Sequence, residues 1–150
     1  MNPLALATAA SLLAATAPAQ VISEQEFIAS VLVAESGGEP VGGMQAVLEV
    51  IWTRHLEWEQ TFWKVLTTRK AFSCLNKTTP QKLIAKSKQH TRWAYAMALC
   101  ETMPKTRLAK RANHYCDINC NPYWARGKRP VAVIGNHKFY RIDNNKLKPK

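Results

Sequence analysis

The first third of the chain contains no basic residue at all. Residues 1–53 have no Lys or Arg and five Glu, which gives this part a formal charge of −5. Residues 54–150 carry all 21 basic residues and five acidic ones, so their charge is +16 and the net charge is +11. This excess of positive charge favours a polyanionic partner, such as an anionic cell wall, a membrane surface or a nucleic acid.

Beyond residue 19 the chain also lacks any apolar run long enough to span a bilayer. It has no internal repeat, low-complexity tract or linker, so we expect one domain. We also expect a monomer. The apolar run at 4–17 leads into Ala17-Pro18-Ala19, which has the form of a signal-peptidase site, although no Lys or Arg precedes it. We predict a signal peptide at 1–19 and an exported domain at 20–150 that begins at Gln20. The alternative is an Ala-rich tail or an N-terminal helix.

Cysteines are few, and none of them is in a CxxC pair. The four are Cys74, Cys100, Cys116 and Cys120. In an exported chain an even number predicts two disulfides with three possible pairings, of which we favour Cys74–Cys100 with Cys116–Cys120. Zinc bound by His114, Cys116 and Cys120 is the alternative. Because that spacing matches none of the usual zinc arrangements, we expect no metal and no other cofactor.

The stretch Ala34-Glu35-Ser36-Gly37-Gly38-Glu39-Pro40 ends an apolar helical pattern. Four apolar residues lie at one-turn spacing before it: Phe27, Ile28, Val31 and Leu32. Glu35 continues their stripe, and the glycines and proline that follow stop the helix. Burial and the negative end of the helix dipole both disfavour an ionised carboxyl there, and a protonated carboxyl is a general acid. The alternative is that Glu35 merely leaves the core as the helix ends.

The remaining patterns predict a mainly helical fold with a small antiparallel β element. Ser23 and Glu26 form a capping box for a first helix. Aromatic residues mixed with Asn and His in the last third would suit sugar rings, although nucleic-acid bases would stack there as well. We expect helices over 24–36, 43–58, 59–67 and 80–101, the last burying Leu83, His90, Ala94 and Met97, and a ribbon that pairs 131–134 with 109–115.

Six sequence blocks in one order resemble the SleB-type cell wall hydrolases. These are spore-cortex and phage or bacterial peptidoglycan enzymes related to lytic transglycosylases. The resemblance covers about residues 28–141, and its blocks are A-E-S-G-G-E-P, G-M-Q-A-V-x-x-V-I-W-T-R, F-S-C-L-N, A-N-H-Y-C, N-P-Y-W-A and I-G-N-H-K-F-Y-R. It implies a lysozyme-like fold and cleavage of the β-1,4 bond between N-acetylmuramic acid and N-acetylglucosamine.

The same resemblance places the family's catalytic acid on Glu35 and its second glutamate on Glu39. Two positions depart from the family pattern. Ser36-Gly37 replaces the usual Ala-Arg, and Thr53 replaces an Asn, so any role of that Asn is in doubt. Glu35 followed by Ser36 is similar to the Glu-Ser pair of the broader lytic transglycosylases.

A mechanism with one carboxyl suits the sequence best, because no later Asp or Glu has an apolar setting and Glu39 looks like an exposed turn residue. Our candidates for binding the N-acetyl and hydroxyl groups of the glycan are Ser36, Ser73, Tyr115, His137 and Tyr140, although each could instead serve packing or anchor a loop. We expect peptidoglycan strands and the anionic wall as partners, with no nucleic acid.

Two other functions remain open at this stage. One is a secreted binding module that holds wall glycan or nucleic acid without cutting it. A binding module has no use for a carboxyl at the end of an apolar stripe, so Glu35 disfavours it. The other is a nuclease based on His114 and His137, which would need Asp117 as a metal ligand.

Overall fold

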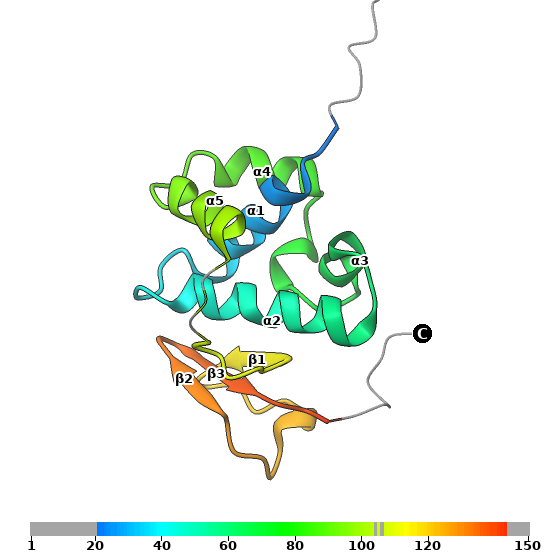
Figure 1. Ribbon diagram of the computed structural model, residues 1–150, viewed down its shortest axis with the longest axis vertical. Coiled ribbons are helices and arrows are strands. Elements are labelled where there is room, and N and C mark those ends of the chain that lie inside the picture. The colour runs from blue at the N-terminus through cyan, green and yellow to red at the C-terminus, as the bar shows by residue number, and fades with distance from the viewer. Residues whose placement is uncertain (1–20, 104, 106, 144–150) are drawn as a thin grey trace, which may run out of the picture.

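The computed structural model describes residues 21–103, 105 and 107–143, and it is mainly helical with one small sheet (Figure 1). The predicted signal peptide at 1–19 lies outside the described residues. Among the described residues, no helix has the length and apolar character needed to cross a membrane. The elements are α1 (Glu24–Ser36), α2 (Gly43–Trp58), α3 (Phe62–Thr67), η1 (Ser73–Leu75), α4 (Pro80–Ser87), α5 (Trp93–Thr102), β1 (His114–Asp117), η2 (Tyr123–Ala125), β2 (Ala132–Ile134) and β3 (His137–Tyr140).

Helix α1 is the centre of the helical part. It packs against α2, α3, α4 and α5, and every residue from Phe27 to Val33 is buried. The single stripe expected from the sequence is therefore only one part of its buried surface, as is usual for a helix enclosed on all sides. Ser30 is tolerated there because its hydroxyl donates to the Phe27 carbonyl at 2.7 Å. The predicted bounds of α1 and its Ser23 N-cap are confirmed.

Helix α2 also has its predicted bounds, whereas the next two predictions need correction. Helix α3 begins at Phe62 rather than at residue 59, because Glu59 takes a left-handed conformation that ends α2 and Thr61 then caps α3. The long helix predicted over 80–101 is two helices, α4 and α5.

The break between α4 and α5 has a local cause. His90 Nδ1 accepts a hydrogen bond from Arg92 N at 3.1 Å, which diverts that N–H from a helical carbonyl. Arg92 Nη1 donates to the Glu39 carbonyl at 2.5 Å and so fixes the bend against the loop that joins α1 to α2. As a result His90 and Ala94 are exposed instead of buried, and Ala96 and Leu99 face the core.

The sheet has the order β1-β3-β2, and all pairs are antiparallel. The predicted pairing of 131–134 with 109–115 is therefore wrong, because β3 lies between β2 and β1. Strands β2 and β3 are joined by the two-residue turn Gly135-Asn136, with Gly135 at φ 55°. Side chains alternate, so Tyr115 and Phe139, which are opposite one another, share the face that packs on the helices.

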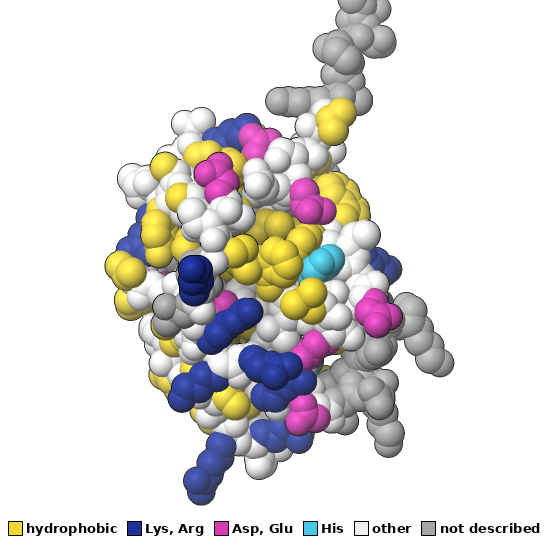
Figure 2. Space-filling model, in the orientation of Figure 1, with side chains coloured by type: hydrophobic (Ala, Val, Ile, Leu, Met, Phe, Trp, Pro, Cys, Tyr) yellow, Lys and Arg dark blue, Asp and Glu magenta, His cyan; other side chains and the backbone are white. Residues whose placement is uncertain are grey.

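Basic side chains gather at the sheet end of the molecule. Figure 2 shows Lys and Arg side chains over the lower part of one face, where Figure 1 places the sheet. This agrees with the distribution of charge in the sequence, since all the basic residues follow residue 53.

Candidate active site

Glu35 lies half-buried in the last turn of α1, and three donors from distant segments meet its carboxylate. Ser73 Oγ and Cys74 N donate to Oε1 at 3.3 and 3.2 Å. Tyr115 OH donates to Oε2 at 2.9 Å. The sequence predicted Glu35, Ser73 and Tyr115 as site residues, and the structure brings these three together. A carboxylate held from two sides in this way has a fixed direction.

Tyr115 supplies the shortest of these hydrogen bonds from strand β1. Its burial, and next the charge of Glu35, raise the pKa of the Tyr115 phenol well above its usual range. The hydroxyl therefore stays protonated and remains a donor. The ring is held by aromatic neighbours on the helix-facing side of the sheet, with centroid distances of 5.2 Å to His137 and 5.7 Å to Phe139.

Arg54 is a site residue that the sequence reasoning missed. It is buried, with its guanidinium carbon 5.2 Å from the Trp58 ring centroid and 5.4 Å from that of Phe72. Its Nε donates to the Asn113 carbonyl at 2.7 Å, while its Nη1 is buried and has no hydrogen-bond partner in the described part of the chain. Burial lowers the pKa of Arg54 to about 10, against the opposing effects of Tyr115 and Glu35.

One signal in the sequence could have indicated Arg54. It is the first basic residue of the chain, and it follows the apolar run Val50-Ile51-Trp52 within a buried helix. A lone cation at such a position needs a partner, and buried charges are rare unless they are paired or serve a site. The positive charge of Arg54 interacts with both Tyr115 and Glu35.

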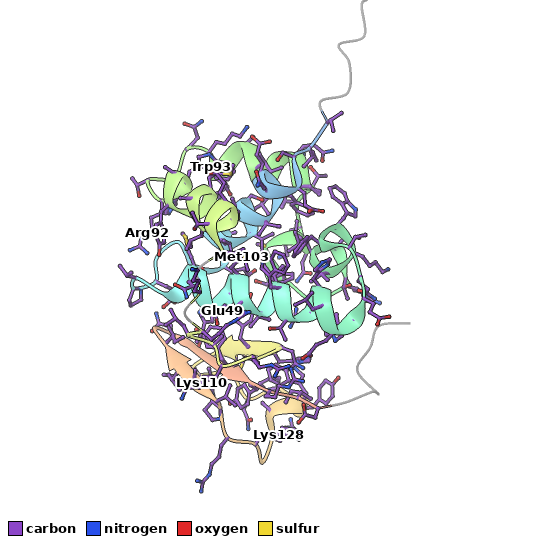
Figure 3. The ribbon with its side chains drawn as sticks, viewed as in Figure 1. Glu49, Arg92, Trp93, Met103, Lys110 and Lys128 are labelled. Carbon is purple, nitrogen blue, oxygen red and sulfur yellow. The ribbon has the colours of Figure 1, made fainter. Side chains whose placement is uncertain are left out.

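Glu39 is not the exposed turn residue that we expected, since only 8% of its surface is accessible. The β2–β3 turn folds over the α1–α2 loop and covers it. Asn136 N donates to Glu39 Oε2 at 2.8 Å, and His137 Nδ1 lies 3.7 Å from Oε1. A Cβ on Gly135 would collide with Oε2, so only glycine permits this approach. Figure 3 shows Arg92 beside the same loop.

Two of the predicted substrate-binding residues do not reach the site. Ser36 is buried, and its hydroxyl donates to the Leu32 carbonyl at 2.9 Å, along its own helix. Tyr140 points to the opposite face of the sheet from Tyr115, where it packs with Trp124 and Ile142. The alternation of side chains along β3 causes this, because Tyr140 is an odd number of residues from His137.

His137 lies beside Tyr115 and Glu39, as its prediction as a site residue requires, whereas His114 belongs to the other face of the sheet. The ring centroids of His114 and Trp124 are 5.0 Å apart. Burial of His114, and next the positive charge of Arg54, lower the pKa of His114 to about 4. The nuclease hypothesis needs His114 and His137 to converge, and the structure does not bring them together. Within the described residues, no group of three or more His, Cys, Asp or Glu side chains could hold a metal ion.

All four cysteines are described, and the structure shows them as free thiols. The predicted disulfides are therefore absent from it. Cys116 and Cys120 nevertheless lie close together, because a turn returns the chain after β1 and Cys116 Sγ lies 3.8 Å from the Cys120 carbonyl oxygen. Cys74 lies beside Glu35, and its burial, then that carboxylate, raise the pKa of its thiol far above the usual range. The pairing remains a prediction.

A family model described as Cell Wall Hydrolase matches residues 38–140. The chain belongs to this cell wall hydrolase family. It is therefore an enzyme that cleaves peptidoglycan, as the sequence blocks predicted. The matched span includes Glu39, Tyr115 and His137, and it begins just after Glu35. No match was found among curated proteins.

Two solved structures share the fold of this cell wall hydrolase. The catalytic domain of the Bacillus cereus SleB protein is 22% identical over 77% of this chain and 88% of that one, with a TM-score of 0.55. The catalytic domain of the germination-specific lytic transglycosylase SleB from Bacillus anthracis is 21% identical over 77% and 92%, with a TM-score of 0.61. The predicted lysozyme-like, mainly helical class is confirmed.

Proposed function

We propose that this hydrolase is a lytic transglycosylase that cleaves the β-1,4 bond between N-acetylmuramic acid and N-acetylglucosamine with Glu35 as its single catalytic carboxyl. The observation that carries the proposal is the setting of Glu35. It is half-buried at the end of a core helix, and two of its three donors are hydroxyl groups. The similar fold of the B. anthracis protein, which is described as a lytic transglycosylase, supports the same reading.

The two other buried carboxylates of this region, Glu39 and Glu49, are enclosed by protein groups. Glu39 has one oxygen on Asn136 N and the other facing His137. Glu49 is buried, and both of its oxygens accept backbone N–H groups. Glycosidases with two carboxyls need the second one open to the sugar, at roughly 5–5.5 Å from the first when retaining or 6.5–9.5 Å when inverting. These closed environments favour a mechanism in which the substrate supplies the nucleophile.

The proposed reaction uses Glu35 twice. As a carboxylic acid it donates its proton to the glycosidic oxygen, and the bond from that oxygen to C1 of the muramic acid breaks. As a carboxylate it then takes the proton of the muramic 6-hydroxyl, whose oxygen bonds to C1. The products are a 1,6-anhydromuramic end and a free 4-hydroxyl on the glucosamine, and Glu35 is protonated again.

The neighbours of Glu35 have distinct roles in this scheme. Tyr115 OH orients Oε2 and, with the positive charge of Arg54, stabilises the carboxylate formed after the first proton transfer. Ser73 is exposed, so its hydroxyl is able to exchange Glu35 for an N-acetyl or hydroxyl group of the glycan. His137 lies against the Tyr115 ring and is the remaining candidate for a contact with the sugar.

The proposed setting is outside the cytoplasm, on a wall reached by export through the segment at 1–19. The positive charge of residues 54–150 then attracts the enzyme, as a monomer, to an anionic wall. Nucleic acid is not required as a partner, because the same charge serves binding to the wall.

A muropeptide assay tests the proposal. Wild type, Glu35→Gln and Glu24→Gln are incubated with purified peptidoglycan, and the released fragments are analysed by mass spectrometry. Glu24 is an exposed residue of the same helix, so Glu24→Gln is the matched control. We expect 1,6-anhydro fragments from wild type and from the control and almost none from Glu35→Gln. Near-normal cleavage by a folded Glu35→Gln protein would refute the assignment, and hydrated reducing ends would indicate a hydrolytic muramidase instead.

A further inference from the structure

An open pocket of about 680 Å³ lies between α1 and α4, next to Glu35. Ala34, which precedes Glu35, forms part of its wall. Cys74 forms another part, and its backbone N–H donates to Glu35 Oε1 at 3.2 Å. Glu35 itself does not line the pocket, but Ala34 and Cys74 connect the two, so the pocket lies beside the candidate catalytic carboxyl.

Three lysines line this pocket. Lys82 and Lys86 are one turn apart on α4, so they share a face of that helix, and Lys77 comes from the segment just before it. All three are exposed, and none of them has an Asp or Glu within ion-pair distance among the described residues. By contrast, Lys88, at the end of α4 and outside this pocket, pairs with Glu26 at 2.5 Å. Like charges at this spacing repel one another, so an anion bound among the three lysines is attracted by all three and reduces that repulsion.

We propose that this lysine pocket binds the carboxylates of the stem peptide that peptidoglycan carries on its muramic acid. The proposal rests on the proposed function, because the peptide is attached to the sugar whose bond Glu35 would cut. A stem peptide extends by at most about 3.3–3.6 Å per residue, so its first acidic residues lie within a pocket's length of that sugar. Val33 and Leu83, which also line the pocket, suit the methyl and methylene groups of such a peptide.

The kinetic test compares two substrates made from one preparation. Peptidoglycan freed of teichoic acids is used intact, and a second portion is stripped of its peptides with an amidase. The lactyl carboxylates that the amidase exposes on the muramic acid are then converted to neutral methyl amides. The variant is Lys82→Gln/Lys86→Gln. The matched control is Lys64→Gln/Lys128→Gln, which removes the same charge at exposed positions outside the pocket. Circular dichroism verifies that both proteins are folded.

We expect the pocket variant to lose about 3- to 10-fold in cleavage of intact peptidoglycan, the effect of two exposed ion pairs, and nothing on stripped glycan. The control variant should show the same small loss of cleavage on intact peptidoglycan and on stripped glycan. An equal loss on both substrates, or no loss on either, would overturn the proposal. A loss that appears only when teichoic acids are left on the wall would assign the pocket to phosphate and would overturn it as well.

A binding measurement separates this inference from the proposed function. Calorimetry with the Glu35→Gln protein compares a synthetic stem peptide bearing free carboxylates with the same peptide in amide form. The acidic peptide should bind about 3- to 10-fold more tightly, and Lys82→Gln/Lys86→Gln should abolish that preference. Equal binding of the two peptides would refute the lysine pocket even if Glu35 is catalytic. If Glu35→Gln still cleaves glycan, the proposed function fails while this preference remains measurable.

Discussion

Glu35 and Glu49 lie on adjacent helices and both accept hydrogen bonds from distant segments, yet their surroundings differ. Glu49, which Figure 3 labels on α2, is only 3% exposed. Leu108 N and Ala109 N donate to its two oxygens at 2.9 and 2.7 Å, and the segment that leads to the sheet is fixed by them. Glu35 is half-buried, and its partners include two side-chain hydroxyls.

The difference shows what separates an anchoring carboxylate from one available for chemistry. Backbone N–H groups cannot turn away, so a buried carboxylate that they hold is locked into its place in the fold. Hydroxyl groups rotate and exchange partners, and partial exposure lets a substrate approach. Burial alone would therefore have selected the wrong glutamate.

The largest expected effect comes from replacing Glu35. Glu35→Gln keeps the shape of the side chain but removes the carboxyl proton, so glycan cleavage should fall by about 10²–10⁴-fold. The unfolding midpoint should change little, because this end of α1 is partly exposed. Turbidity loss of peptidoglycan suspensions and thermal unfolding measure the two quantities. If Glu35→Gln lowers the unfolding midpoint strongly but keeps its specific activity, Glu35 is an anchoring carboxylate and not the catalytic one.

Glu49→Gln should show the opposite pattern. The amide nitrogen would face one of the two backbone N–H groups, which leaves a buried donor without an acceptor. We expect a loss of about 1–3 kcal/mol in the free energy of unfolding, with cleavage by the folded fraction close to wild type. Urea unfolding measures the stability. If Glu49→Gln is as stable as wild type, the anchoring role is wrong.

Tyr115→Phe tests the hydroxyl at Glu35 directly. It removes the hydrogen bond at 2.9 Å but keeps the ring that packs against Phe139. A loss of about 10- to 150-fold in cleavage is expected, since a hydrogen bond to a charged group contributes roughly 1.5–3 kcal/mol. Unchanged activity at every pH would remove Tyr115 from the site.

Glu39→Gln should have a smaller effect than Glu35→Gln, although Glu39 is buried. An amide oxygen still accepts from Asn136 N, and only the charge facing His137 is lost. We expect at most about a 10-fold loss of cleavage, which corresponds to an indirect electrostatic contribution of about 1.4 kcal/mol. The comparison uses the same muropeptide assay. A loss equal to that of Glu35→Gln would make Glu39 a second catalytic carboxyl.

The last effect concerns stability below neutral pH rather than cleavage. The pKa of His114 is lowered from 6.5 to about 4 in the folded chain, so between these values the unfolded chain binds more protons. Stability from the neutral ring is present above pH 6.5 and falls as the pH drops toward 4. After allowance for partial exposure, the loss should be about 1–2 kcal/mol. Urea unfolding of wild type and His114→Phe at pH 7, 5.5 and 4 gives the free energy of unfolding at each pH. This free energy should fall less steeply with decreasing pH in the variant than in wild type.

The sequence predicted the features that depend on neighbouring residues. The bounds of α1 and α2 agree with prediction, because the Ser23 cap and the glycines after Glu35 act locally. The break before α5 was not predictable in this way, since it depends partly on Arg92 reaching the carbonyl of Glu39, 53 residues away.

The site followed the same rule. Glu35, Ser73 and Tyr115 could be chosen by motif, but their contacts join residues 38 and 80 apart in the chain. Arg54 was missed because the usual preference of Arg for the surface argues against a buried one. The closure over Glu39 was missed because it depends on the position of the Gly135 turn, which follows from the central place of β3 in the sheet.

The absence of basic residues from residues 1–53 has a consequence for the order of folding. Three of the five glutamates there, Glu35, Glu39 and Glu49, have donors between residues 73 and 137, and Glu49 also accepts a hydrogen bond from Gln45 on its own helix. We expect a hairpin of α1 and α2 to form early from local contacts, with most of its carboxylate oxygens hydrated until the later segments dock. We therefore expect the reaction centre to form only when those segments dock, so that a chain halted after α1 and α2 would be inactive.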